Sequence, residues 1–172
     1  MIRLGVTALI SCMMIGCAED LPLETVPQVE IHRYMGTWYE IASFPAWFQK
    51  DCVGTTATYS LNKDATVKVI NRCFKTTLKG SETRAEGSAY IEDDITNAKL
   101  NVTFFWPFYG KYWIIDLAED YSYAVVGHPN RKYLWILSRT PKMSPHLYDS
   151  LVSRIQKKGF DVSKLNKTLQ PQ

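Results

Sequence analysis

The sequence predicts an all-β fold, an eight-stranded antiparallel up-and-down β-barrel followed by one helix. Eight short strand-like runs follow one another with only short links between them, and barrel closure leaves such a chain no free edge. Aromatic residues make up 13% of the chain, which suits strands and an apolar interior better than a helical bundle. A single segment near the C-terminus has helical periodicity.

The eight strands are delimited by residues that favour turns. The expected strands are 37–43, 53–61, 66–74, 83–91, 99–106, 111–117, 121–127 and 133–139. The links between them include 44–48, 62–65, 79–80, 93–97, 107–110 and 128–131, which are rich in Pro, Gly, Asn and Asp. A short helical turn at 31–35 is expected before the first strand.

The helix is expected from 144 to 158. Ser144 suits the N-cap, Pro145 suits the first helical position, and Gly159 suits the end. Apolar residues recur on one helical face at Leu147, Leu151 and Ile155. A final extended piece is expected near 160–162.

The N-terminal segment is expected to lie outside the fold. Residues 1–16 have a basic start and then an apolar stretch that is too short for a spanning helix of about 20 residues, so they indicate a secretory signal. The signal ends Met14-Ile15-Gly16-Cys17, which resembles the bacterial lipobox, where cleavage precedes a cysteine that is then acylated, for example with palmitate. The alternative is an ordinary signal cut near Ala18.

An acylated Cys17 would anchor the protein to a membrane, because two or three acyl chains hold a protein stably where one does not. Residues 17–30 are expected to be a lipidated tether, since 18–29 contains two prolines and three acidic residues. The remaining residues, 31–172, form the barrel domain.

Two cysteines remain after Cys12 leaves with the signal and Cys17 takes lipid. An exported chain folds in an oxidising compartment, which favours a Cys52–Cys73 disulfide. With Leu61 opposite Thr66 in the second hairpin, the two thiols lie on one face as diagonal neighbours, and a β-bulge brings them into register. Such a bridge contributes roughly 3 kcal/mol. Two buried free thiols are the alternative.

Two segments carry a resemblance to a known family. They are Gly36-Thr37-Trp38-Tyr39-Glu40-Ile41-Ala42 and Tyr133-Leu134-Trp135-Ile136-Leu137-Ser138-Arg139-Thr140-Pro141. Together they resemble the lipocalins, and with the runs 56–61, 104–110 and 159–164 they are similar to the bacterial outer-membrane branch close to apolipoprotein D. The likeness covers about residues 31–165. The middle motif, usually Thr-Asp-Tyr, is Glu119-Asp120-Tyr121 here.

The resemblance implies that the helix packs outside the barrel and that Trp38 and Arg139 stack at its closed end, a favourable cation–π arrangement. It also implies that the barrel binds fatty acids or lysophospholipids, for storage or transport during envelope maintenance under stress. Because Ala18 rather than Asp follows Cys17, the analogy with lipoprotein sorting favours the bacterial outer membrane.

Aromatic residues are the candidates for lining or rimming the pocket, although each is as consistent with ordinary packing. They are Phe44, Trp47, Phe48, Phe104, Trp106, Phe108, Tyr112 and Trp113. The loop 44–48 lies at the open mouth if Trp38 closes the other end, where it would serve as a lid, a ligand contact or a homodimer patch. Candidate partners for a ligand phosphate are Lys50, Lys111 and Arg72.

Other functions have little support. The net charge is only +3 and no Lys/Arg block is present, so no nucleic-acid partner is expected. None of His32, His128 and His146 has metal-ligand spacing, so no metal or cofactor is expected, and no catalytic motif is recognisable. Glu40 would point into the barrel, paired with Arg139 or another base, or acting as an acid/base. The alternatives are a lipocalin-fold enzyme, such as an isomerase or lipid hydrolase using a thiol or Glu40, and a haem or pigment binder.

Overall fold

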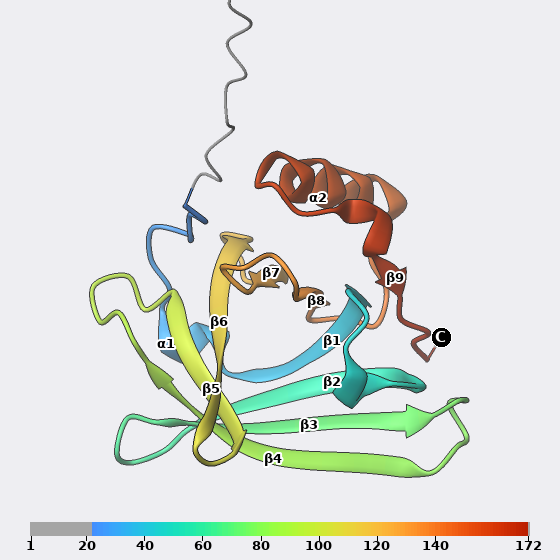
Figure 1. Ribbon diagram of the computed structural model, residues 1–172, viewed down its shortest axis with the longest axis horizontal. Coiled ribbons are helices and arrows are strands. Elements are labelled where there is room, and N and C mark those ends of the chain that lie inside the picture. The colour runs from blue at the N-terminus through green and yellow to red at the C-terminus, as the bar shows by residue number, and fades with distance from the viewer. Residues whose placement is uncertain (1–21, 172) are drawn as a thin grey trace, which may run out of the picture.

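The computed structural model describes residues 22–171 and confirms the predicted fold class (Figure 1). Eight antiparallel strands close into a barrel because β1 pairs with both β8 and β2, and one long helix lies outside the ring. The strands are β1 (Gly36–Ser43), β2 (Cys52–Leu61), β3 (Val67–Lys75), β4 (Glu82–Ile91), β5 (Lys99–Phe105), β6 (Phe108–Leu117), β7 (Tyr123–Gly127) and β8 (Leu134–Ser138). The predicted signal and Cys17 lie outside the described residues.

Two details of the predicted hairpins are corrected. Leu61 pairs with Val67 rather than with Thr66, because Asp64 accepts hydrogen bonds from the backbone N–H and the hydroxyl of Thr66 and so holds that residue in the turn. Strand β6 begins at Phe108 rather than at residue 111, since residues 106–107 alone form the link from β5.

The helix α2 (Pro145–Lys157) begins and ends as predicted from its caps. The Ser144 side chain accepts a hydrogen bond from the Leu147 N–H at 3.3 Å, and Gly159 has a left-handed φ of 84°. Leu151 and Ile155 are buried against the outside of the barrel, in a cluster that includes Phe44, Leu134, Ile136 and Phe160. A second core fills the barrel interior, where Trp38, Tyr59, Val69, Ile114 and Val126 are buried.

Residues 22–30 pack on the barrel, so the tether prediction is wrong for this part of 17–30. The Val26 N–H donates to the Ile114 carbonyl at 2.9 Å, and the Val29 N–H donates to the Thr96 carbonyl at 2.8 Å. Leu23 and Val29 are buried. Apolar residues at every third position therefore outweigh the prolines and acidic residues from which a tether was expected. The short α1 (Ile31–Tyr34) follows.

The chain ends beside the first strand. After η2 (Val162–Lys164), a two-residue strand, β9 (Asn166–Lys167), pairs with β1, in place of the extended piece expected near 160–162. No helix within residues 22–171 is long and apolar enough to cross a membrane.

Candidate functional site

The closed end of the barrel is sealed by the predicted Trp38–Arg139 pair. The Arg139 guanidinium carbon lies 3.8 Å from the centroid of the Trp38 ring, and the Trp38 Nε1 donates to the Tyr34 carbonyl at 2.9 Å. Trp38 is completely buried. The prediction that these two residues close one end is confirmed.

Three tyrosine hydroxyls meet on the floor of the barrel above this seal. The Tyr112 hydroxyl lies 2.8 Å from that of Tyr34 and 3.0 Å from that of Tyr59. Burial raises the pKa of Tyr59 to about 12, and it also raises the pKa values of Tyr34 and Tyr112 well above the ordinary value. All three are therefore neutral near pH 7. A small void of about 10 Å³ remains beside them.

Small side chains form the inner wall between the floor and the mouth. Ala57, Asn71 and Ala85 are paired across β2, β3 and β4, and they alternate with residues that face outward. Ala85 is exposed although it is on the inner face, so the barrel is open to solvent along β4. A side chain at Gly87 would meet the Phe104 ring at 2.8 Å, which places that ring inside the barrel. The Phe104 ring therefore fills the space in front of Gly87, whereas the wall at Ala57 and Ala85 carries no large side chain.

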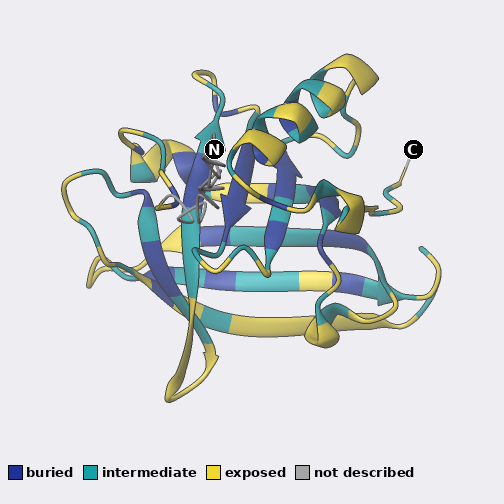
Figure 2. Ribbon diagram, turned by 45° about the horizontal axis from the view of Figure 1, so that its top comes forward, coloured by how far each residue is buried: buried dark blue, intermediate teal, exposed yellow. Residues whose placement is uncertain are grey.

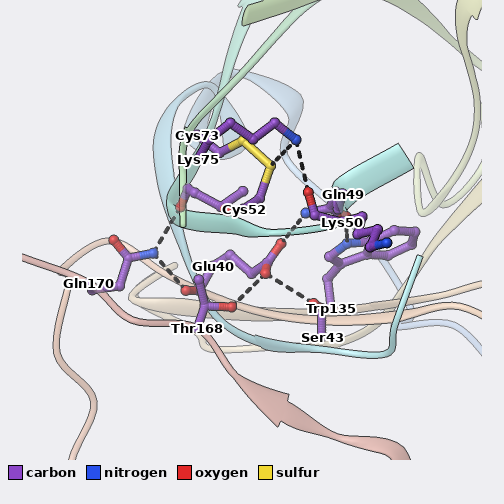
Figure 3. Close-up of a disulfide and its surroundings, with 11 residues drawn as sticks. Glu40, Ser43, Gln49, Lys50, Cys52, Cys73, Lys75, Trp135, Thr168 and Gln170 are labelled. Carbon is purple, nitrogen blue, oxygen red and sulfur yellow. Dashed lines mark hydrogen bonds between the residues drawn. A yellow bond between two sulfur atoms is a disulfide. The ribbon is translucent and has the colours of Figure 1, made fainter. Parts of the chain in front are cut away.

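A polar cluster centred on Glu40 lies near Cys52 and Cys73 (Figure 3). The buried Glu40 carboxylate accepts hydrogen bonds from Ser43, Gln49 and Thr168 at 3.0, 2.7 and 2.5 Å. The Trp135 Nε1 donates to Gln49 Oε1 at 2.9 Å. No basic side chain in residues 22–171 forms an ion pair with Glu40, so the expected pairing with Arg139 is wrong. Arg139 lies at the closed end, and neutral donors solvate the carboxylate instead.

The C-terminal segment fills a gap in the barrel wall next to this cluster. β1 and β2 pair only from Gly36 to Tyr39 and then separate. Beyond that point the Thr168 N–H donates to the Ile41 carbonyl at 2.9 Å, and the Gly54 N–H donates to the Leu169 carbonyl at 2.7 Å. The segment thereby replaces the missing strand-to-strand hydrogen bonds and keeps the wall continuous.

The predicted Cys52–Cys73 disulfide is present, with an S–S distance of 2.01 Å and a Cα–Cα distance of 5.4 Å. The predicted bulge is present too, between Val53 and Thr56. Neither cysteine is a free thiol, which removes the thiol version of the enzyme alternative. The bridge joins β2 to β3 at the mouth (Figure 3).

Two candidate ligand residues lie inside the barrel and four project from its mouth. Phe104 and Tyr112 are on the inner wall and the floor. The side chains of Trp47, Phe48, Trp106 and Phe108 are 83, 49, 76 and 71% exposed. The first two come from η1 (Trp47–Gln49) and the others from the β5–β6 hairpin.

Phe44 and Trp113 lie outside the barrel wall, which corrects their expected place in the ligand set. A bulge at Ile41 reverses the alternation in β1, and the Phe44 ring packs on Phe160 with ring centroids 6.1 Å apart. Trp113 follows the inward Tyr112 and so points outward, where the Lys99 ammonium lies 4.7 Å from its ring centroid.

Of the three basic residues expected to meet a ligand phosphate, two point away from the barrel interior. Arg72 and Lys111 point outward and form ion pairs with Glu82 and Glu92 at 3.7 and 2.5 Å. Lys50 is exposed at the mouth. Sequence reasoning missed Lys75, which lies on the inward face two residues after Cys73 and donates to the Lys50 carbonyl at 2.8 Å. Strand alternation from Cys73 was the signal that pointed to it.

The three histidines are dispersed. His32 lies in α1, His146 in α2 and His128 in the β7–β8 link, where its Nδ1 accepts from the Asn130 N–H at 3.1 Å. Residues 22–171 contain no group of three or more His, Cys, Asp or Glu side chains arranged to hold a metal ion.

Comparisons with known proteins agree with this geometry. A profile described as a lipocalin-like domain matches residues 29–170. The chain is 45% identical to temperature-induced lipocalin-1 of Arabidopsis thaliana, covering 88% of this chain and 85% of that protein. It is 40% identical to the outer membrane lipoprotein Blc of Escherichia coli K12, covering 92% and 91%, and 33% identical to bovine apolipoprotein D, covering 81% and 76%.

Among solved structures, insecticyanin from the tobacco hornworm Manduca sexta superposes with a TM-score of 0.70, covering 87% of this chain and 85% of that one. Its sequence identity is 20%, so this likeness concerns the fold alone.

Proposed function

The chain belongs to the lipocalin family, whose members are generally binding proteins, and on that premise we propose that it binds a fatty acid or lysophospholipid with the acyl chain inside the barrel. The observation that carries the proposal is the inner wall of small side chains at Ala57 and Ala85, which lies beyond the sealed floor and is open to solvent at Ala85. An acyl chain buried there gains about 0.8 kcal/mol for each CH₂ removed from water.

The head group is proposed to stay at the mouth, near Lys75. This ammonium is the inward-facing cation beside the disulfide, and it is half-buried. Its charge suits a carboxylate or a phosphate, both of which bind cations through short charge-assisted hydrogen bonds. The floor offers only neutral hydroxyls at Tyr34, Tyr59 and Tyr112, which suits the uncharged end of the ligand.

The proposed location is the bacterial outer membrane, with the protein anchored through acyl chains on Cys17. The lipobox-like Met14-Ile15-Gly16-Cys17 supports it, and so does the likeness to proteins named outer membrane lipoproteins. We propose that the anchored protein stores or transports lipid during envelope maintenance under stress.

The test uses a chain that begins at Ala18. Ligand is titrated into it while Trp fluorescence is recorded as the measure of binding. Oleate and oleyl alcohol have the same hydrocarbon chain and differ in the charge of the head group, and a lysophospholipid adds a phosphate. We expect saturable one-to-one binding of all three, with oleate bound more tightly than the alcohol. Absence of saturable binding of all three ligands would overturn the proposal.

The variant Lys75→Ala tests the head-group assignment. It is expected to weaken oleate binding by roughly tenfold, which is the scale of one charge-assisted hydrogen bond, and to leave the alcohol unaffected. The matched control is Lys111→Ala, whose ammonium faces outward and pairs with Glu92. Equal losses for acid and alcohol would show that Lys75 does not meet the head group.

A further inference from the structure

A cluster of exposed aromatic side chains projects from the mouth and has no partner among the described residues that would cover it. At the β5–β6 hairpin, Phe105, Trp106 and Phe108 are 75, 76 and 71% exposed, and Phe105 stacks on Phe108 with ring centroids 6.4 Å apart. Trp47, at 83%, projects from the β1–β2 link. The hairpin tip stands out from the body of the barrel (Figure 2). We call these four residues the aromatic rim.

Charge is distributed unequally between the two ends of the barrel. The four strand links at the mouth, 44–51, 76–81, 106–107 and 128–133, contain four basic residues and one acidic residue. The three links between strands at the closed end, 62–66, 92–98 and 118–122, contain one basic residue and six acidic residues. An anionic surface therefore attracts the mouth and repels the closed end.

The N-terminal segment leaves the fold next to one of the mouth links. Pro22 and Leu23 line a surface groove together with Pro129, Asn130, Arg131 and Lys132 of the β7–β8 link. Cys17 is five residues before Pro22, a distance that an extended chain spans with at most about 17 Å. An acyl anchor on Cys17 would thus hold this link close to the membrane.

We propose that the aromatic rim docks the mouth of the barrel on an anionic lipid bilayer, with Trp106 and its neighbours in the head-group layer. Aromatic rings favour that layer because one part of it is apolar and the other is wet. Basic side chains around the rim add attraction to anionic lipids. In this orientation a lipid passes between bilayer and barrel without crossing bulk water.

A second copy of the chain fits the rim less well. A mouth-to-mouth dimer brings two sets of basic links face to face, and like charges oppose such a contact. A contact from mouth to closed end is heterologous, so it builds a ring or a filament and not a two-fold dimer. An anionic bilayer accommodates the exposed aromatic side chains in its head-group layer and also attracts the basic residues at the mouth.

The proposal is tested with the chain that begins at Ala18, which keeps every described residue and lacks the acylation site. Sedimentation with vesicles of phosphatidylglycerol and phosphatidylethanolamine measures partitioning without any added ligand, so the result is independent of cavity binding. We expect Phe105→Ser/Trp106→Ser to reduce partitioning by about tenfold or more. The matched control is Ile95→Ser, since Ile95 is 82% exposed at the closed end.

Charge is tested in the same assay. Lys79→Glu at the mouth is expected to weaken binding to these anionic vesicles, whereas Lys63→Glu at the closed end is expected to leave it unchanged. Added salt should weaken the binding of the unmodified chain. Circular dichroism and a peptide map of the disulfide verify that each variant is folded.

Two results would overturn the proposal. One is equal partitioning of the Phe105→Ser/Trp106→Ser and Ile95→Ser variants. The other is light scattering that shows a dimer which only the rim variant dissociates, because the rim would then be a subunit interface. Failure of lipid binding in the cavity, with vesicle docking retained, would remove the proposed function and leave this inference in place.

Discussion

The guanidinium of Arg139 lies over the ring of Trp38, with its carbon 3.8 Å from the ring centroid, and so connects the end of β8 to β1. Its two terminal nitrogens donate to the carbonyls of Thr37 and Arg33 at 3.1 and 2.7 Å. One side chain therefore holds β1, the end of β8 and the end of α1 together. These contacts join the three elements at the closed end of the barrel.

Replacing Arg139 by Ala is expected to lower the free energy of unfolding by about 2–4 kcal/mol, because it removes one cation–π contact and two hydrogen bonds from a charged donor. Urea unfolding measures the loss as a lower midpoint at an unchanged slope. The control is Lys142→Ala, an exposed residue in the same link. If both variants unfold at the same urea concentration, the joint does not stabilise the barrel.

Removing the Cys52–Cys73 disulfide tests how much this bridge stabilises the mouth of the barrel. The bridge spans 21 residues of sequence, so the Cys52→Ala/Cys73→Ala variant is expected to lose roughly 3 kcal/mol. For a chain of this size the thermal midpoint falls by roughly 6–12 °C. Calorimetry measures the thermal midpoint of the variant and of the unmodified chain with its disulfide reduced. The two midpoints should be equal. A variant as stable as the oxidised chain would contradict the loop-closure argument.

Much of the fold could be predicted because its signals are local. The caps at Ser144 and Gly159 located the helix, and the spacing of Cys52 and Cys73 pointed to a bulge, which the structure contains. The docking of Leu23 and Val29 could not be predicted from a segment judged by its prolines and charges. Its stability depends on contacts with β6 and the β4–β5 link, which are distant in sequence.

The site was less predictable, for two physical reasons. The bulge at Ile41 changes which residues of β1 face inward, and it moved Phe44 to the outer core. Large aromatic rings were also expected to line the pocket, whereas part of the inner wall consists of small residues such as Ala57 and Ala85. Strand alternation counted from Tyr59 through its paired residues would have placed both on the inner face.

Alkaline pH is expected to unfold the protein through its buried tyrosines. Burial raises the pKa of Tyr59 from the ordinary 10 to about 12, and it raises those of Tyr34 and Tyr112 well above the ordinary value too. The unfolded chain then loses these protons first, so stability is complete below about pH 10 and is lost as the pH rises towards 12. The Tyr59 shift alone corresponds to roughly 3 kcal/mol.

The absorbance of tyrosinate measures ionisation as the pH rises, and circular dichroism measures unfolding over the same pH range. Exposed tyrosines are expected to ionise first, and the three floor tyrosines only as the barrel unfolds. The variant Tyr112→Phe should move the unfolding transition to higher pH, because one buried hydroxyl fewer has to ionise. Ionisation of all ten tyrosines in one step while the barrel stays folded would contradict the prediction.

Filling the inner wall is expected to block the ligand without unfolding the chain. Ala85 faces inward but is exposed, so Ala85→Phe places its ring in open space and overpacks nothing until a ligand enters. Oleate affinity should then fall by roughly tenfold or more, the scale of steric overpacking. The matched control is Ser88→Phe, exposed on the outer face of the same strand, which should bind oleate normally. If the Ser88 variant loses affinity while the Ala85 variant keeps it, the ligand binds outside the barrel. Equal urea midpoints for both variants would show that the loss at Ala85 is steric, since unfolding would lower the midpoint as well.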